Sequence, residues 1–162
     1  MNVVAINELS KEKVIEFFKE HWGSPQMVIS TGIYDCSTLD GFAVLKEDKI
    51  IGLITYDIQN GECEIISLDS VEEGKGIGSA LVQEVERLAL NKNCNVLKLV
   101  TTNDNLLALK FYQKRGFILS QIFNNAVEKA RKLKPEIPLI GNDGIPIRDE
   151  IELKKFLNGS SL

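Results

Sequence analysis

The sequence predicts a single domain of the α+β class, in which a mixed sheet is combined with helices. Strand-like segments joined by tight turns follow one another between residues 42 and 69, a pattern typical of an antiparallel meander. From residue 77 onward, segments with helical spacing alternate with short apolar segments. An alternation of strands and helices favours a sheet that also contains parallel pairs.

Length and composition fit one domain spanning residues 1–162. The chain is 44% hydrophobic and 26% charged, which is the balance of a globular protein. Its formal net charge of −4 argues against nucleic acid as a partner, because a polyanion binds basic surfaces.

The three cysteines indicate free thiols in a reducing compartment. Cys36, Cys63 and Cys94 are odd in number and far apart, without a CxxC pair. His21 is the one histidine, which argues against a histidine-based metal site, and we expect no metal. No apolar run reaches membrane-spanning length and none resembles a signal peptide, so we expect a cytoplasmic protein that does not bind membranes.

The first half begins with a strand at residues 3–6 and a helix between its N-cap Ser10 and its stop signal Gly23. Residues 23–40 are rich in turn formers and are predicted as a loop, apart from a short apolar stretch. Three strands follow, at residues 42–45, 50–58 and 62–69, joined at Glu47-Asp48 and Asn60-Gly61.

Helical and extended segments alternate in the second half. Apolar residues at 77, 81, 85 and 88 predict a helix. The remaining predicted elements are a strand at 96–100, a helix at 106–115 ending at Gly116, a strand at 117–121, a basic helix at 125–132, and a strand or helix at 150–156.

A glycine-rich turn connects the third strand of the meander to the helix at residue 77. Gly74, Gly76 and Gly78 alternate there, and unsatisfied amides at a helix start favour a phosphate or pyrophosphate. The spacing GxGxG differs from the P-loop and from the dinucleotide fingerprint GxGxxG. A tight turn that holds no ligand is the alternative.

A second segment adds a specific resemblance. Asn105, Ala108, Phe111-Tyr112 and Gly116-Phe117 stand in the order and spacing of a motif of the GNAT superfamily of N-acyltransferases. The other family motif, Q/R-x-x-G-x-G/A, is matched by residues 73–78 except at Glu73. Together, the two motifs and their strands cover residues 40–121, and the sequence resembles that family.

The resemblance implies a central mixed, mostly antiparallel twisted sheet of about six to seven strands with helices on both faces. It also implies an N-acetyltransferase that passes acetyl from acetyl-CoA directly to an amine of a small molecule or protein in a ternary complex. A non-catalytic acyl-CoA-binding sensor or interaction module of the same fold is the alternative, and pairing of C-terminal segments into a homodimer stays open.

The cofactor-binding residues follow from the resemblance. The backbone amide of Leu68 would bind the thioester carbonyl, and Asn105 would contact the pantetheine arm or cap its helix. The pyrophosphate would be held by the amides of the turn: Gly74, Lys75, Gly76, Ile77, Gly78 and Ser79. Glu73 is unfavourable there unless it turns into solvent or pairs with a neighbour such as Lys75.

Two residues are predicted as catalytic. Tyr112 matches the family tyrosine and is the candidate acid for the leaving thiolate, with a core aromatic as the alternative. Glu64 is the candidate base, and Glu62 is its rival. Strand alternation predicts that Glu64 shares a face with Ile66 and Leu68, where burial would raise its pKa; the alternative is a solvated charge.

The acceptor is predicted to meet residues 23–40 and 122–149. Trp22, Tyr34 and Asp35 are candidate pocket residues. The second segment is expected to form an ordered lid or interface, and its basic run is either a solvated face or an acceptor site: Lys129, Arg131, Lys132 and Lys134.

Overall fold

The computed structural model describes residues 1–72 and 74–157. Glu73, at which the sequence departs from the family motif, lies outside the described residues.

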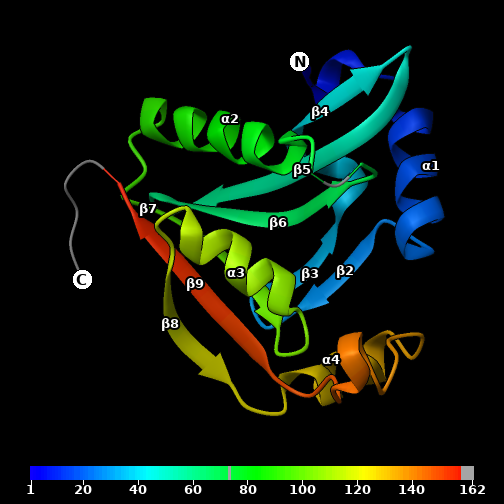
Figure 1. The fold of residues 1–162 in the computed structure, drawn as a ribbon, viewed down its shortest axis with the longest axis vertical. Coiled ribbons are helices and arrows are strands. Elements are labelled where there is room, and N and C mark those ends of the chain that lie inside the picture. Colours follow the sequence, from blue (N-terminus) through cyan, green and yellow to red (C-terminus); the bar gives the residue numbers. More distant parts are fainter. Residues whose placement is uncertain (73, 158–162) are drawn as a thin grey trace.

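A seven-stranded mixed sheet forms the centre of the molecule (Figure 1). Only one neighbouring pair, β6 with β7, is parallel, and all the others are antiparallel, which confirms the predicted mixed, mostly antiparallel sheet. The strands in spatial order are β1 (Asn2–Ala5), β4 (Asp40–Lys46), β5 (Lys49–Gln59), β6 (Glu62–Ser70), β7 (Val96–Thr102), β9 (Glu150–Phe156) and β8 (Ile118–Phe123).

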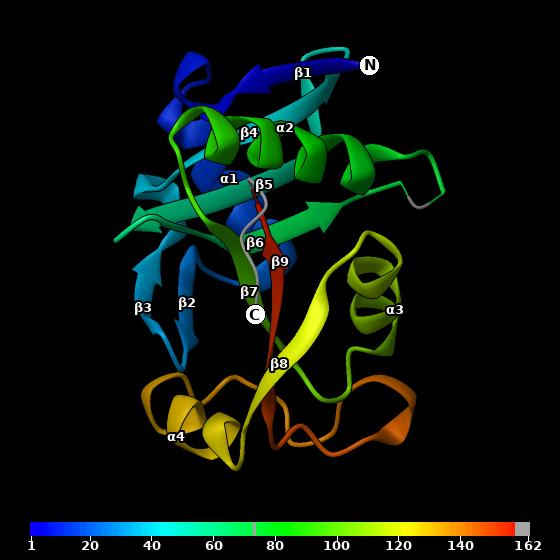
Figure 2. The ribbon, with the colours of Figure 1, turned by 90° about the vertical axis from the view of Figure 1, so that its left-hand side faces the viewer.

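Helices cover both faces of this sheet, as predicted. Neighbouring residues of β4 point to opposite sides, so Ala43 joins the core beneath α1 (Lys11–Trp22), whereas Val44 joins the core beneath α2 (Ile77–Asn91). Figure 2 shows α2 in front of β5 and α1 behind it. The helix α3 (Leu106–Lys114) lies on the α2 side, and α4 (Ala126–Leu133) follows β8.

Local signals in the sequence act as expected. The Ser10 side chain accepts a hydrogen bond of 3.2 Å from the amide of Lys13, and Gly23 ends α1 with a φ of 81°. Both residues of the turn Asn60-Gly61 have positive φ, 52° and 75°, which matches the twist of a tight hairpin.

The prediction of a loop at residues 23–40 is wrong in part. This segment contains a two-stranded antiparallel hairpin of β2 (Gln26–Ile29) and β3 (Gly32–Asp35). Its strands are only four residues long, too short for a clear pattern, and contacts distant in sequence support them. One such contact is the hydrogen bond of 2.7 Å from Lys134 Nζ to the carbonyl of Gln26. The ambiguous segment at the C-terminus is strand β9, inserted between β7 and β8.

Strands β6 and β7 separate part-way along their length. Their parallel pairing begins at Glu62 with Val96 and ends at Ile65 with Leu99. Beside this point β6 contains a bulge, because Thr55 pairs with Ser67 and Tyr56 pairs with Ile65, which leaves Ile66 without a partner on β5.

The bulge corrects one prediction. Ile66 packs in the core beneath α1, on the side of Glu64, whereas Leu68 packs against the core beneath α2. The three side chains therefore do not share one face, since the extra residue reverses the alternation.

Candidate active site

The gap between β6 and β7 leads into a cavity of about 350 Å³ that reaches both sides of the sheet. We call it the gap cavity. Its walls on the α3 side include Asn105, Ala108 and Tyr112, and those on the hairpin side include Met27 and Ile29. The other lining residues are Trp22, Ile65, Ile66, Ser67, Leu68, Asp69, Leu99, Val100, Thr101, Thr102 and Glu150.

A second cavity of about 580 Å³ lies between the glycine turn and α3, and we call it the turn cavity. Gly74, Gly76, Gly78 and Ser79 line it. It shares five lining residues with the gap cavity, so the two adjoin: Leu68, Asp69, Asn105, Ala108 and Tyr112.

The glycine turn presents backbone to the turn cavity. Gly74 and Gly76 have φ of 73° and 75°, and Gly76 caps α2 without a side-chain hydrogen bond. The backbone bond from Ala80 to Gly76, 3.0 Å long, closes the first helical turn, so the amides before Ala80 precede the ladder. A Cβ built on Gly74 or Gly76 would meet nothing within 4 Å. Amides at a helix start, together with the helix dipole, suit an anion.

One acidic side chain of the glycine turn pairs with a lysine of strand β4. Lys75 is exposed, and Glu72 forms an ion pair of 3.4 Å with Lys46. This contact turns one carboxylate of the turn toward the strand β4.

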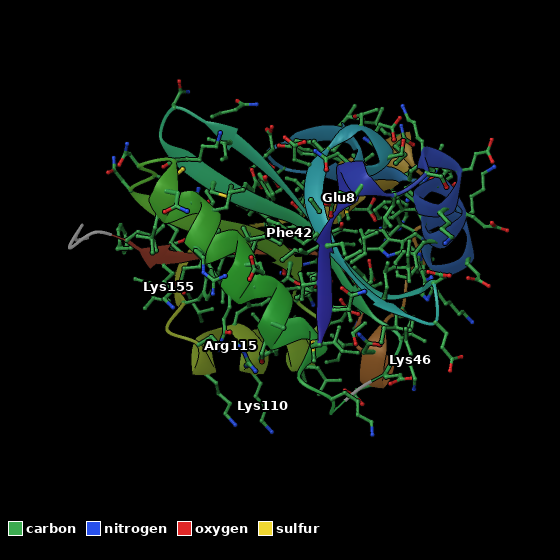
Figure 3. All side chains as sticks on the ribbon, turned by 90° about the horizontal axis from the view of Figure 1, so that it is seen from above. Glu8, Phe42, Lys46, Lys110, Arg115 and Lys155 are labelled. Carbon is green, nitrogen blue, oxygen red and sulfur yellow. The ribbon has the colours of Figure 1, made fainter. Side chains whose placement is uncertain are left out.

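Arg115 is a site residue that the sequence analysis missed. Its guanidinium lies 3.6 Å from the centroid of the Phe111 ring, and its Nε donates to Ser79 Oγ over 3.1 Å. Figure 3 shows Arg115 between α3 and α2. It lines the turn cavity and places a positive charge beside the helix start. Its position directly before Gly116 of the family motif was the available signal.

The amide of Leu68 faces the gap. Val71 donates its backbone hydrogen to Ile51 over 2.8 Å, which sets the alternation of β6. Amides of residues 69 and 71 therefore point toward β5, and that of Leu68 points away from it.

Tyr112 and Asn105 lie where the two cavities meet. The Tyr112 ring packs edge-on against Phe111 and Phe117, and burial raises its pKa, so its hydroxyl stays protonated. Tyr112 is therefore both a core aromatic and a lining residue. Asn105 accepts a hydrogen bond of 3.1 Å from the amide of Ala108, which confirms the helix-cap alternative, and it also lines both cavities.

Glu64 lies in a third cavity, of about 250 Å³, beneath the hairpin tip. It is only 6% exposed, so it is not a solvated charge. Thr31 Oγ1 donates to its Oε2 over 2.8 Å, and burial raises the pKa of Glu64 although this bond lowers it. Its rival Glu62 forms an ion pair of 2.8 Å with Lys98. The structure thus does not bring Glu64 into the cavity that Tyr112 lines.

Two further carboxylates line the gap cavity and were not predicted. Glu150, the first residue of β9, is 2% exposed. Asp69 follows Leu68, and its Oδ2 is buried without a hydrogen-bond partner in the described part of the chain. Burial raises the pKa of Asp69, while Trp22 and His21 lower it. The available signal was their place near strand ends: Asp69 near the end of β6, before the glycine turn, and Glu150 at the start of β9.

The segment at residues 122–149 is ordered, as expected, but it contributes no described residue to the gap cavity. Two of its basic residues, Arg131 and Lys134, have structural contacts, whereas Lys129 and Lys132 are exposed. Arg131 donates to the carbonyls of Ile137, Pro138 and Ile147, and thereby holds the segment together. Of the loop at residues 23–40, Met27 and Ile29 do reach the cavity.

Comparison with known proteins decides the family. The model of the acetyltransferase (GNAT) family matches residues 7–117. The chain belongs to the GNAT family. The uncharacterized protein YxbD of Bacillus subtilis (strain 168) is 56% identical over 158 residues, which are 97% of this chain and 99% of that protein. The uncharacterized N-acetyltransferase MJ1530 of Methanocaldococcus jannaschii is 32% identical over 61% of this chain and 58% of its own length.

Solved structures of GNAT proteins share the fold. A GNAT family acetyltransferase from Elizabethkingia anophelis with acetyl-CoA bound is 26% identical, with a TM-score of 0.65 over 75% of this chain and 78% of that chain. The IAA acetyltransferase from Bacillus cereus ATCC 14579 superposes with a TM-score of 0.70 at 21% identity, over 96% of this chain and 100% of that one. Membership of this family supports acetyl transfer with acetyl-CoA as the acyl donor.

Within residues 1–72 and 74–157, no helix is long and apolar enough to cross a membrane. In the same part of the chain, no group of three or more His, Cys, Asp or Glu side chains is placed to hold a metal ion.

Proposed function

We propose that the protein is an N-acetyltransferase that passes the acetyl group of acetyl-CoA directly to an amine while both are bound. The observation that carries this proposal is the junction of the two cavities at Leu68, Asn105 and Tyr112. A donor held at the glycine turn reaches this junction from the α3 side, and an acceptor reaches it through the gap. The two reagents meet without sharing an entrance.

The donor is held by backbone amides and by one side chain. Gly74, Lys75, Gly76, Ile77, Gly78 and Ser79 form the turn whose amides hold the pyrophosphate, and Arg115 adds a positive charge next to Ser79. The Leu68 amide donates to the thioester oxygen, where negative charge develops during attack.

Proton transfer completes the reaction. The acceptor ammonium first loses one proton to the base, and the resulting amine nitrogen forms the bond to the acetyl carbon. The carbon–sulfur bond then breaks, the thiolate takes up a proton from the acid, and the nitrogen gives up its second proton, which restores the acid. Tyr112 is the proposed acid, because it lines both cavities and its hydroxyl stays protonated. Glu64 is the proposed base, and it acts through water or the Thr31 hydroxyl, since it lines a neighbouring cavity.

The position of Glu64 also favours a second candidate, a non-catalytic module that binds an acyl-CoA. Free-thiol release from acetyl-CoA in the presence of amines tests the choice, with the acetylated product identified by mass. A catalyst releases thiol in step with product. A binding module is stabilised against heat by acetyl-CoA and releases none, and a domain with an empty turn shows no stabilisation.

All three cysteines, Cys36, Cys63 and Cys94, are buried free thiols. We keep the cytoplasm as the proposed location on this basis.

A further inference from the structure

The charges of the gap cavity are of one sign. Asp69 and Glu150 are acidic, and none of the described residues that line the cavity is Lys, Arg or His. Most of the other walls on the hairpin side are apolar, formed by Trp22, Met27 and Ile29.

Glu150 is held in place by the hairpin tip. The amide and the hydroxyl of Ser30 both donate to its Oε1, over 2.8 and 2.5 Å. These bonds fix the carboxylate but use only one of its two oxygens, so Oε2 remains for the cavity that Glu150 lines. Asp104, Glu64 and Glu152, the other buried acidic residues, lie outside that lining.

A fixed, buried carboxylate with one oxygen left over selects a cation. An ammonium group supplies the hydrogen bonds and the charge that Oε2 lacks. A carboxylate on the acceptor would meet Asp69 and Glu150 with no basic residue of the described lining to offset the repulsion.

We propose that the acceptor is a small primary amine with an apolar body and no carboxylate, and that its ammonium group binds Oε2 of Glu150. The cavity volume of about 350 Å³ and its apolar walls suit an aryl-alkyl or alkyl amine. This inference rests on the proposed function and narrows its substrate class.

Three matched compounds test it: 2-phenylethylamine, phenylalaninamide and phenylalanine. The first two carry an amine and no carboxylate, and phenylalaninamide has nearly the bulk of phenylalanine. We expect thiol release from acetyl-CoA with both, and a kcat/KM for phenylalanine lower by about a hundredfold or more, as for an unpaired buried charge. Calorimetric titration of each compound into the CoA-saturated protein should give the same order of affinity.

The variant Glu150→Gln keeps the size of the side chain and an acceptor for Ser30. It should raise KM and Kd for phenylethylamine about tenfold or more, leave the thermal shift with acetyl-CoA unchanged, and narrow the discrimination against phenylalanine. Glu152→Gln is the matched control, because Glu152 is also buried on β9 but accepts from Ser120 outside the cavity.

The outcomes separate the two proposals. Thiol release with phenylalanine equal to that with phenylalaninamide overturns the inference and leaves the acetyltransferase proposal standing. Equal affinity of the parent and Glu150→Gln for phenylethylamine overturns it as well, and so does no binding by either. Stabilisation by acetyl-CoA without thiol release from any amine overturns the acetyltransferase proposal instead.

Discussion

Thr31 donates a hydrogen bond of 2.8 Å to Glu64 and so joins the hairpin tip to strand β6. Ser30, the preceding residue, binds Glu150 of β9. Two consecutive residues of one short turn therefore hold carboxylates from two strands, and each carboxylate faces a different cavity.

The first prediction concerns the pH dependence of acetyl transfer. Burial raises the pKa of Glu64, so a base at this position loses its charge at a higher pH than an ordinary carboxylate, and kcat/KM falls as the pH falls through that value. Thr31→Val removes a bond that lowers the pKa of Glu64, so the acid limb should move to still higher pH. Glu64→Gln should abolish the limb. An unchanged limb in both variants would exclude Glu64 as the base.

Tyr112→Phe should lower kcat by about 10²- to 10⁴-fold, the usual contribution of a positioned acid. The ring contacts with Phe111 and Phe117 remain, so thermal stability and acetyl-CoA affinity should stay close to those of the parent. Single-turnover kinetics measure the chemical step. A variant as fast as the parent there would show that Tyr112 only packs.

Arg115→Ala should weaken acetyl-CoA binding about tenfold, because it removes a positive charge and a donor beside Ser79. Lys110→Ala is the control, since Lys110 is an exposed cation on the same helix (Figure 3). Calorimetry at low and high salt measures the dissociation constants for acetyl-CoA. The constant of Arg115→Ala should differ from that of the parent, and the constant of Lys110→Ala should equal it. If both variants bind acetyl-CoA with the affinity of the parent, Arg115 makes only contacts within the protein and does not bind the cofactor.

Asp69→Asn should stabilise the protein at neutral pH. Burial raises the pKa of Asp69 in the folded state, so ionisation above that pKa opposes folding; below the unfolded-state pKa both states are protonated and the cost disappears. The gain in free energy of unfolding should thus be present at pH 7 and vanish as the pH falls toward 3. Each kcal/mol of this gain should raise Tm by about 2–4 °C. Destabilisation at pH 7 would mean that the charge is compensated in the folded protein.

Gly76→Ala should weaken acetyl-CoA binding. The φ of 75° strains any residue with a Cβ, and the new methyl group would project into open space at the turn cavity. Gly144→Ala is the matched control, because Gly144 has a φ of 73° and equally open surroundings outside the described cavity linings. Both variants should lose about 1 kcal/mol of stability, and only Gly76→Ala should lose acetyl-CoA affinity.

Much of the fold could be predicted because its signals are local. The caps at Ser10 and Gly23, the Asn60-Gly61 turn and the apolar spacing of α2 act within a few residues. The hairpin β2–β3 could not, because strands of four residues carry little pattern and depend on contacts with residues more than a hundred positions away, such as Lys134 and Glu150.

The site shows the same division. The glycine turn, Asn105 and Tyr112 belong to contiguous motifs, and the structure places them around one cavity. Glu150 and Arg115 reach their places only through tertiary contacts, with Ser30 and with Ser79. Simple alternation also put Leu68 on the face of Glu64, because nothing in the local pattern marks the bulge between them.

Ile66, the extra residue of the bulge, reverses the alternation of side chains along β6. Before Ile66, even-numbered side chains such as Glu64 lie on the α1 side of the sheet; after it, those such as Leu68 lie on the α2 side. In a relative without this extra residue, the even-numbered side chains of the strand would all lie on one side of the sheet. Residues that align with one another in sequence could therefore lie on opposite faces.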